Sequence, residues 1–193
     1  MTHIPKMCQA PNLKSIRFAY HPLASIELKA FDHLPNLQSL DLAGNAVIVP
    51  MTTILADTLS MSASFNFSNL DMSRWDNLKN FEPGWIKNMK PYSFIDFLDS
   101  GIETIEKEAF YDVFQILASY DGLVEDPYNP SGHICFGRNP LRCDCSIKWI
   151  VEDPDMLKVI DFGPYDFNRP KCKDGTLVAD LDLEILEALC PDD

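Results

Sequence analysis

Two stretches of the chain repeat one apolar pattern at a fixed distance, and this repetition limits the fold more than any other feature. Residues 37–47 read LQSLDLAGNAV and residues 13–23 read LKSIRFAYHPL, so the copies begin 24 residues apart. Both match the template L-x-x-L-x-L-x-x-N-x-L, whose apolar side chains point to one side of a short strand. His21 stands where the other copy has Asn45. A period of this length predicts stacked strand–turn units.

Weaker copies of the same template continue along the chain. They begin at Tyr92, Val113 and Ser131, and one more strand is expected over 64–67, with its position open by several residues. Each unit would cover the apolar side of its neighbour, since a single unit cannot bury it alone. The sequence therefore predicts an α/β fold in the form of a leucine-rich repeat solenoid, irregular and of about six repeats, over residues 1–138.

The last quarter of the chain carries the features of a disulfide-bonded C-terminal cap. Residues 139–150 read NPLRCDCSIKWI, and Cys172 and Cys190 follow. Stacked units need a segment that shields the last apolar layer, and we expect residues 139–193 to provide it. Four cysteines allow three pairings, among which spacing alone does not choose.

These motifs resemble known families. NPLRCDCSIKW is similar to the cysteine-rich C-terminal flank of extracellular leucine-rich repeat proteins, which implies disulfides Cys143–Cys172 and Cys145–Cys190 and a buried Trp149. The string KCKDGTLVADLDLEILEALC, with CDCSIKWI, resembles arthropod secreted repeat proteins related to the Oplophorus-luciferin 2-monooxygenase non-catalytic subunit. In that family the repeat protein accompanies a separate catalytic chain, which implies a protein partner and no chemistry of its own.

Localisation follows from the cysteines. Disulfides persist in oxidising compartments, so we expect a secreted, extracellular protein. The segment MTHIPKMCQAPNLK lacks the long apolar stretch of a secretory signal. We therefore expect an extracellular form to be trimmed or incomplete at this end.

A zinc site, with His133 as a further ligand, is the alternative use of the four cysteines. Structural zinc sites show paired C-x-x-C motifs, whereas here C-x-C is followed by isolated cysteines. The histidines are scattered, so we expect no metal and no cofactor. Cys8 and Cys135 are left over, and the sequence leaves open whether each is free or joined to another chain.

The motifs do not indicate an enzyme. His133 and Cys135 would lie on one strand face, but a Cys–His nucleophile also needs an orienting group and an oxyanion loop. The sequence has no P-loop, dinucleotide-binding or G-x-S-x-G motif. A net charge of −13 disfavours nucleic acid and anionic membranes as partners. No apolar run has the length of a membrane span, so we expect no membrane insertion.

Binding of another protein is the function that remains. Alternate strand residues point outward, and the central outward column is expected to be Arg17, Asp41, Asn66, Asp96, Leu117 and Cys135. The predicted partner-binding surface on the concave side consists of Phe94, Asp96, Leu98, Phe114, Leu117 and Tyr120. A shift of register would instead place these side chains in the core, and the sequence leaves this alternative open. Asn66, in the sequon NFS, is a glycosylation candidate whose sugar would restrict this surface.

Two functions agree with such a surface. The first is a non-catalytic accessory subunit of a secreted enzyme such as a luciferin monooxygenase. The alternative is an extracellular pattern-recognition protein of innate defence. The sequence leaves the oligomeric state open.

Overall fold

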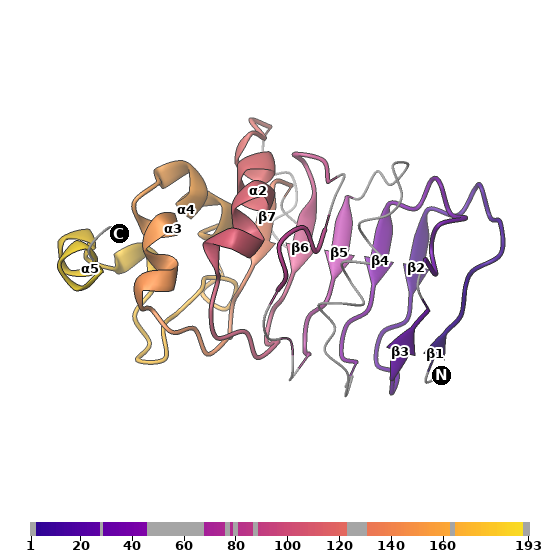
Figure 1. Cartoon of the computed structure of the whole chain (residues 1–193), viewed down its shortest axis with the longest axis horizontal. Coiled ribbons are helices and arrows are strands. Elements are labelled where there is room, and N and C mark those ends of the chain that lie inside the picture. Colours follow the sequence, from indigo (N-terminus) through magenta and orange to yellow (C-terminus); the bar gives the residue numbers. More distant parts are fainter. Residues whose placement is uncertain are drawn as a thin grey trace.

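The computed structural model describes residues 3–27, 29–45, 68–75, 78, 81–86, 89–122, 131–162 and 165–190. In this part of the chain the fold is α/β, with a five-stranded parallel sheet, a two-stranded parallel sheet and four α-helices. Figure 1 shows the strands of the larger sheet side by side in chain order, with the helices toward the C-terminal end.

The strands of the two sheets are short. The larger sheet has the order β2 (Ser15–Arg17), β4 (Ser39–Asp41), β5 (Asn69–Asp71), β6 (Phe94–Asp96) and β7 (His133–Cys135). The smaller sheet pairs β1 (His3–Ile4) with β3 (Ser25–Ile26). The helical elements are α2 (Lys107–Ala118), η1 (Cys145–Ile147), α3 (Lys148–Val151), α4 (Pro154–Ile160), η2 (Val178–Asp180) and α5 (Leu183–Leu189).

The five strands are aligned without offset, and one column of apolar side chains points into the core. This buried column consists of Ile16, Leu40, Leu70, Ile95 and Ile134. Because side chains alternate along a strand, the residues on either side of each member face outward. The backbone ladder continues beyond the strands: Phe18 donates to the carbonyl of Asp41, and Tyr20 donates to that of Ala43.

Each strand of the larger sheet is followed by the same turn. Four residues after the buried strand residue the backbone is left-handed, with φ between 57° and 63°, at Tyr20, Gly44, Arg74, Asp99 and Arg138. This conformation is uncommon for residues other than glycine, so the hydrogen-bonded ladder on both sides must hold it. Arg74, for example, donates its N–H to the carbonyl of Leu98 at 2.7 Å.

The next position in the turn supplies a hydrogen-bond donor to the end of a neighbouring strand. Asn139 donates its amide to the carbonyl of Phe97 at 2.8 Å, and Asn45 occupies the equivalent position. Trp75 performs this role with its indole N–H, which donates to Leu42 at 2.7 Å. Ser100 performs it with its hydroxyl, which donates to Met72 at 2.8 Å. Buried carbonyls need a partner, and side chains of three types, asparagine, tryptophan and serine, provide one here.

The core is continuous from the first strands into the C-terminal segment, and its middle is aromatic. Phe110 on α2 contacts Phe81, Trp85 and Phe136, with ring centroids 4.8 to 5.6 Å apart. Tilted and edge-on aromatic pairs at these separations stabilise a core beyond their buried area. They fix α2 against the inner side of β6 and β7.

The predicted fold class is wrong in its architecture. Instead of an irregular leucine-rich repeat solenoid of about six repeats, the described residues form an α/β fold with a five-stranded parallel sheet, four α-helices and two disulfides. The copy expected to begin at Val113 lies inside α2, where Val113 and Leu117, spaced four apart, are buried on one helix face. The strand expected over 64–67 lies outside the described residues, and β5 follows at Asn69–Asp71.

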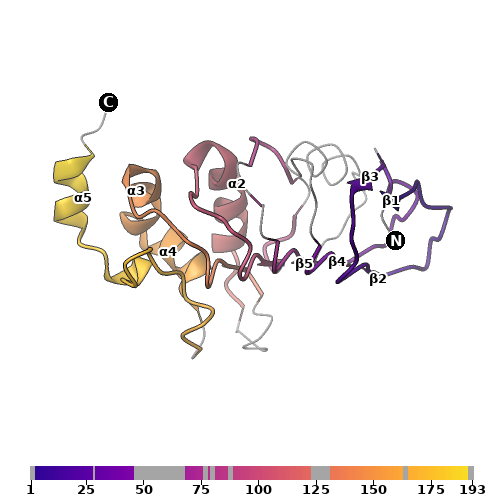
Figure 2. The same ribbon diagram turned by 90° about the horizontal axis from the view of Figure 1, so that it is seen from below.

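The C-terminal segment is cross-linked by two disulfides, Cys143–Cys172 and Cys145–Cys190. These are the pairs that the resemblance of the sequence implies. Trp149, four residues after Cys145, is buried and donates its indole N–H to the carbonyl of Ile105 at 3.1 Å. Figure 2 shows α5 at the far end of the molecule, beyond α3 and α4. No helix among the described residues is long and apolar enough to cross a membrane.

Candidate binding face of the sheet

The outward side of the five-stranded sheet presents two rows of side chains. One row is Ser15, Ser39, Asn69, Phe94 and His133, and the other is Arg17, Asp41, Asp71, Asp96 and Cys135. Neighbouring strands lie about 4.8 Å apart, so side chains at equivalent positions are neighbours. The second row therefore brings three carboxylates together on consecutive strands, and we call Asp41, Asp71 and Asp96 the acidic column.

Local turn chemistry explains why aspartate ends these strands. Each carboxylate of the acidic column accepts the backbone N–H two residues further on, at 2.8 to 3.0 Å, from Ala43, Ser73 and Leu98. Aspartate commonly forms such a bond at the start of a turn. Arg17, which is largely exposed, places its Nε 2.9 Å from the carboxylate of Asp41. The column is thus held in one orientation and faces outward.

Burial and mutual repulsion act on the acidic column. Burial raises the pKa of Asp71 above its ordinary value, and the charge of Asp41 adds to this effect. Burial also raises the pKa of Asp96 to about 6, with a further contribution from Asp71, while the N–H of Leu98 opposes the shift. Adjacent like charges disfavour ionisation and attract cationic groups. At neutral pH the column is a concentrated negative strip.

The C-terminal segment covers the β7 end of this face. Phe162 packs against Phe94 and Cys135, and the Cys135 thiol lies 3.8 Å from the carbonyl and side-chain oxygens of Asn168. Gly137 permits the approach, because a Cβ there would overlap the carbonyl oxygen of Phe167. Among the described residues, the open part of the face therefore lies over β2, β4 and β5.

His133 and Cys135 do not form a nucleophilic pair. Nδ1 of His133 lies 2.6 Å from the carbonyl oxygen of Ser131, whereas the Cys135 thiol faces Asn168. Burial raises the pKa of the Cys135 thiol far above its ordinary value, and Asp96 adds to the shift. A reactive cysteine needs a thiolate, so this thiol is a packed side chain.

The rim of the open face carries an arginine held by a tyrosine. Arg74 donates from Nη1 to the hydroxyl of Tyr20 at 2.7 Å, and its guanidinium lies 5.8 Å from the ring centroid. The Tyr20 ring crosses Gly44 to reach it, since a Cβ at Gly44 would lie 2.5 Å from the ring. The pair sets a cation beside the acidic column.

The residues of the predicted partner-binding surface differ in their burial. Phe94, Phe114 and Leu117 are buried, which corrects the prediction of an exposed apolar strip. Phe114 and Leu117 face the core because they belong to α2, and Phe94 points outward but is covered by Phe162.

The other predicted site residues are partly accessible or lie outside the described part. Asp96 and Leu98 lie half-buried on the sheet face, next to Phe94. Tyr120 is half-buried and lines a separate cavity of about 420 Å³ together with His133. Asn66 lies outside the described residues. The sequence analysis does not find Asp71 and Arg74, because Trp75 replaces the asparagine of the template and Asn77 replaces its last apolar residue.

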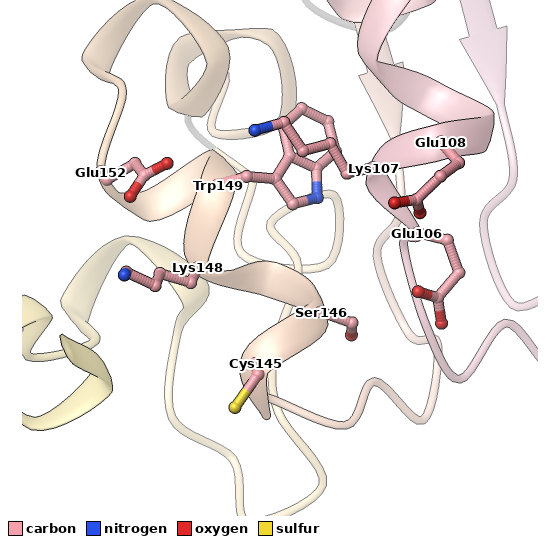
Figure 3. A pocket seen from close by; sticks show the side chains of 8 residues that line it. All are labelled: Glu106, Lys107, Glu108, Cys145, Ser146, Lys148, Trp149 and Glu152. Atoms are coloured by element: carbon pink, nitrogen blue, oxygen red, sulfur yellow. The ribbon is translucent and has the colours of Figure 1, made fainter. Parts of the chain in front are cut away.

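A second cavity, of about 360 Å³, lies between the start of α2 and α3 (Figure 3). Its charged side chains have both signs, Glu106, Lys107, Glu108, Lys148 and Glu152. Figure 3 shows the Trp149 ring among them. Cys145 also lines it but is bound in a disulfide. This mixture favours no particular ligand, and among the described residues no group of three or more His, Cys, Asp or Glu could hold a metal ion.

Fold and site together define a disulfide-linked α/β protein that presents a charged sheet face. No family model matches the chain. The chain is similar to the Oplophorus-luciferin 2-monooxygenase non-catalytic subunit of Oplophorus gracilirostris, with 21% identity over 181 residues. The match covers 93% of this chain and 43% of the relative, so the chain spans less than half of the relative's length. This similarity supports the resemblance found in the sequence, and that relative is, by its name, a non-catalytic subunit.

Proposed function

We propose that this chain is a secreted, non-catalytic protein that binds a partner protein on the open sheet face over β2, β4 and β5. The observation that carries the proposal is the acidic column, three carboxylates in register on the outward side of the sheet, of which Asp41 and Asp71 lie on the part that the described C-terminal segment leaves open. A binding surface on a sheet changes little on binding, because the backbone hydrogen bonds already fix the positions from which its side chains project. The two disulfides favour an oxidising, extracellular compartment.

The charge of the face indicates the chemistry of the partner. The whole chain carries −13, and the acidic column adds a local field that steers cationic groups toward it. A partner loop with lysine or arginine side chains would place them over Asp41 and Asp71. Arg74 and Arg17 at the margin then orient the loop, since each repels a misplaced cation.

The relative supports an accessory role. Its name describes a non-catalytic subunit of a monooxygenase, and this chain buries its Cys135 thiol away from His133. The catalytic groups of a complex would then belong to the partner. We therefore propose an accessory subunit of a secreted enzyme, such as a luciferin monooxygenase.

Charge neutralisation on the sheet face tests this proposal. Asp41→Asn with Asp71→Asn removes two charges but keeps the oxygen that each turn needs. The control, Asp155→Asn with Asp174→Asn, removes two exposed charges elsewhere. The tagged chain is cross-linked in secretions of its source organism, the linked protein is identified, and its Kd is measured with each variant.

We expect the face variant to weaken binding about tenfold or more and the control to change it little, since contact charges contribute more than distant ones. Cross-links to the sheet face and an enzyme as partner support the accessory role. Equal affinities for both variants, or cross-links confined to other surfaces, would refute the binding face. A glycan or microbial surface as the ligand would instead favour pattern recognition.

A further inference from the structure

Helix α5 carries an exposed apolar pair that the sheet face does not use. Ile185 is 58% exposed and Leu189 is 70% exposed. Among the described residues, the other large apolar side chains with high exposure are aromatic: Tyr20, Tyr92, Tyr111 and Phe167. Residues four apart share one side of a helix, so Ile185 and Leu189 form a single apolar ridge. Exposed aliphatic pairs of this kind mark interaction sites more often than isolated residues do.

The helix that carries the ridge is anchored at both ends. Asp182 accepts the backbone N–H groups of Glu184 and Ile185 at its start. Cys190 follows the helix and is bound to Cys145, and Lys148 donates to its carbonyl at 3.3 Å. Leu186 faces inward and is buried. The ridge is therefore displayed in a fixed orientation at the far end of the molecule (Figures 1 and 2).

The chain segment that carries the ridge has one sign of charge, although Lys148 lies near its end at the Cys190 carbonyl. Residues 174–190 contain five acidic side chains and no lysine or arginine. Glu184 and Glu187 are exposed on α5 itself. A second copy of the chain would bring like charges together at the ridge, which opposes self-association. A partner segment whose apolar side chains are bordered by lysine or arginine would match both the ridge and its charge.

We propose that α5 is a second docking surface, for a basic amphipathic segment of another protein. Ile185 and Leu189 insert between apolar side chains of that segment, and Glu184 and Glu187 meet its lysine or arginine side chains. Amphipathic helices commonly present apolar anchors to their partners at this spacing. The surface is separate from the sheet face, so the two can be tested independently.

A synthetic amphipathic helical peptide of leucine and lysine serves as the probe, with a leucine–glutamate peptide as its counterpart. Ile185→Ser with Leu189→Ser removes the ridge without changing any charge. Tyr92→Ser removes an exposed ring elsewhere and is the matched control. Glu184→Gln with Glu187→Gln removes only charge. Fluorescence anisotropy gives each Kd, and circular dichroism checks that every variant is folded.

We expect the ridge variant to weaken binding of the basic peptide about tenfold or more, because two large aliphatic side chains are no longer buried. Tyr92→Ser should leave it unchanged, the glutamine variant should reduce its salt dependence, and the acidic peptide should not bind. Equal binding by the ridge variant would show unspecific attraction to an acidic protein and overturn the proposal. The proposal would also be overturned if sedimentation velocity showed a dimer that the ridge variant abolishes. It would likewise be overturned if the chain bound phosphatidylcholine vesicles and the ridge variant did not.

Loss of partner binding in the Asp41 and Asp71 variant leaves the α5 proposal untouched, and loss in the ridge variant leaves the sheet face untouched. The two proposals therefore fail separately.

Discussion

Replacing Asp96 by asparagine should make the protein more stable at neutral pH. The carboxyl lies between Asp71 and Cys135 in the outward row, and burial raises its pKa from 3.8 to about 6. A group with a raised pKa in the folded state binds its proton more tightly there than in the unfolded chain. The protonated carboxyl therefore stabilises the folded state fully below pH 3.8, and this stabilisation is lost as the pH rises through about 6.

The size of the effect follows from the pKa. A rise from 3.8 to about 6 corresponds to about 3 kcal/mol of unfolding free energy lost by ionisation. Asparagine avoids this loss, and its side-chain oxygen can still accept the N–H of Leu98, which Asp96 accepts at 2.8 Å. Its amide can also donate toward Asp71. We expect Asp96→Asn to gain roughly 1–3 kcal/mol at pH 7.5 and little at pH 4.

Urea unfolding followed by tryptophan fluorescence measures this difference, because Trp75, Trp85 and Trp149 are all buried. Asp155→Asn, at an exposed site, corrects for the change in net charge. An advantage of Asp96→Asn that is the same at pH 4 and pH 7.5, or a variant less stable than the parent at pH 7.5, would refute the raised pKa.

Three further predictions concern single features of the fold. Gly44→Ala should lower the unfolding free energy by about 1–3 kcal/mol, because its Cβ meets a tyrosine ring at a positive φ; no loss in urea unfolding would contradict this. Iodoacetamide should modify the exposed Cys8 but spare the buried Cys135 until denaturant is added, as peptide mass mapping can show. Removing the Cys145–Cys190 disulfide with two serines should cost about 2–4 kcal/mol in thermal unfolding, and an unchanged melting temperature would show that the bond does not constrain α5.

The short strands could be predicted wherever the apolar template is intact. Copies beginning at residues 13, 37, 92 and 131 correspond to β2, β4, β6 and β7. β5 was not located because two template positions differ there: Trp75 stands in place of asparagine, and Asn77 stands in place of the last apolar residue. The prediction of a strand in the copy that begins at Val113 is wrong, because apolar residues spaced three and four apart also describe one side of a helix.

The binding face was harder to predict than the strands. Alternation correctly turns Phe94 outward, but its burial depends on Phe162, which lies 68 residues further along the chain. Local periodicity contains no information about such a contact. The disulfide pairs came from resemblance and not from spacing, and the division of the chain at residues 138 and 139 stays a prediction.

The turn that follows each strand also bears on how such proteins diverge. The carbonyl at the strand end requires a donor but does not specify its chemistry, since an amide, an indole and a hydroxyl all serve. Substitutions among these side chains can therefore accumulate without loss of the fold, while each one erases part of the recognisable pattern. A chain under this weak constraint can change most of the positions that make its repeat recognisable and still keep its strands in register.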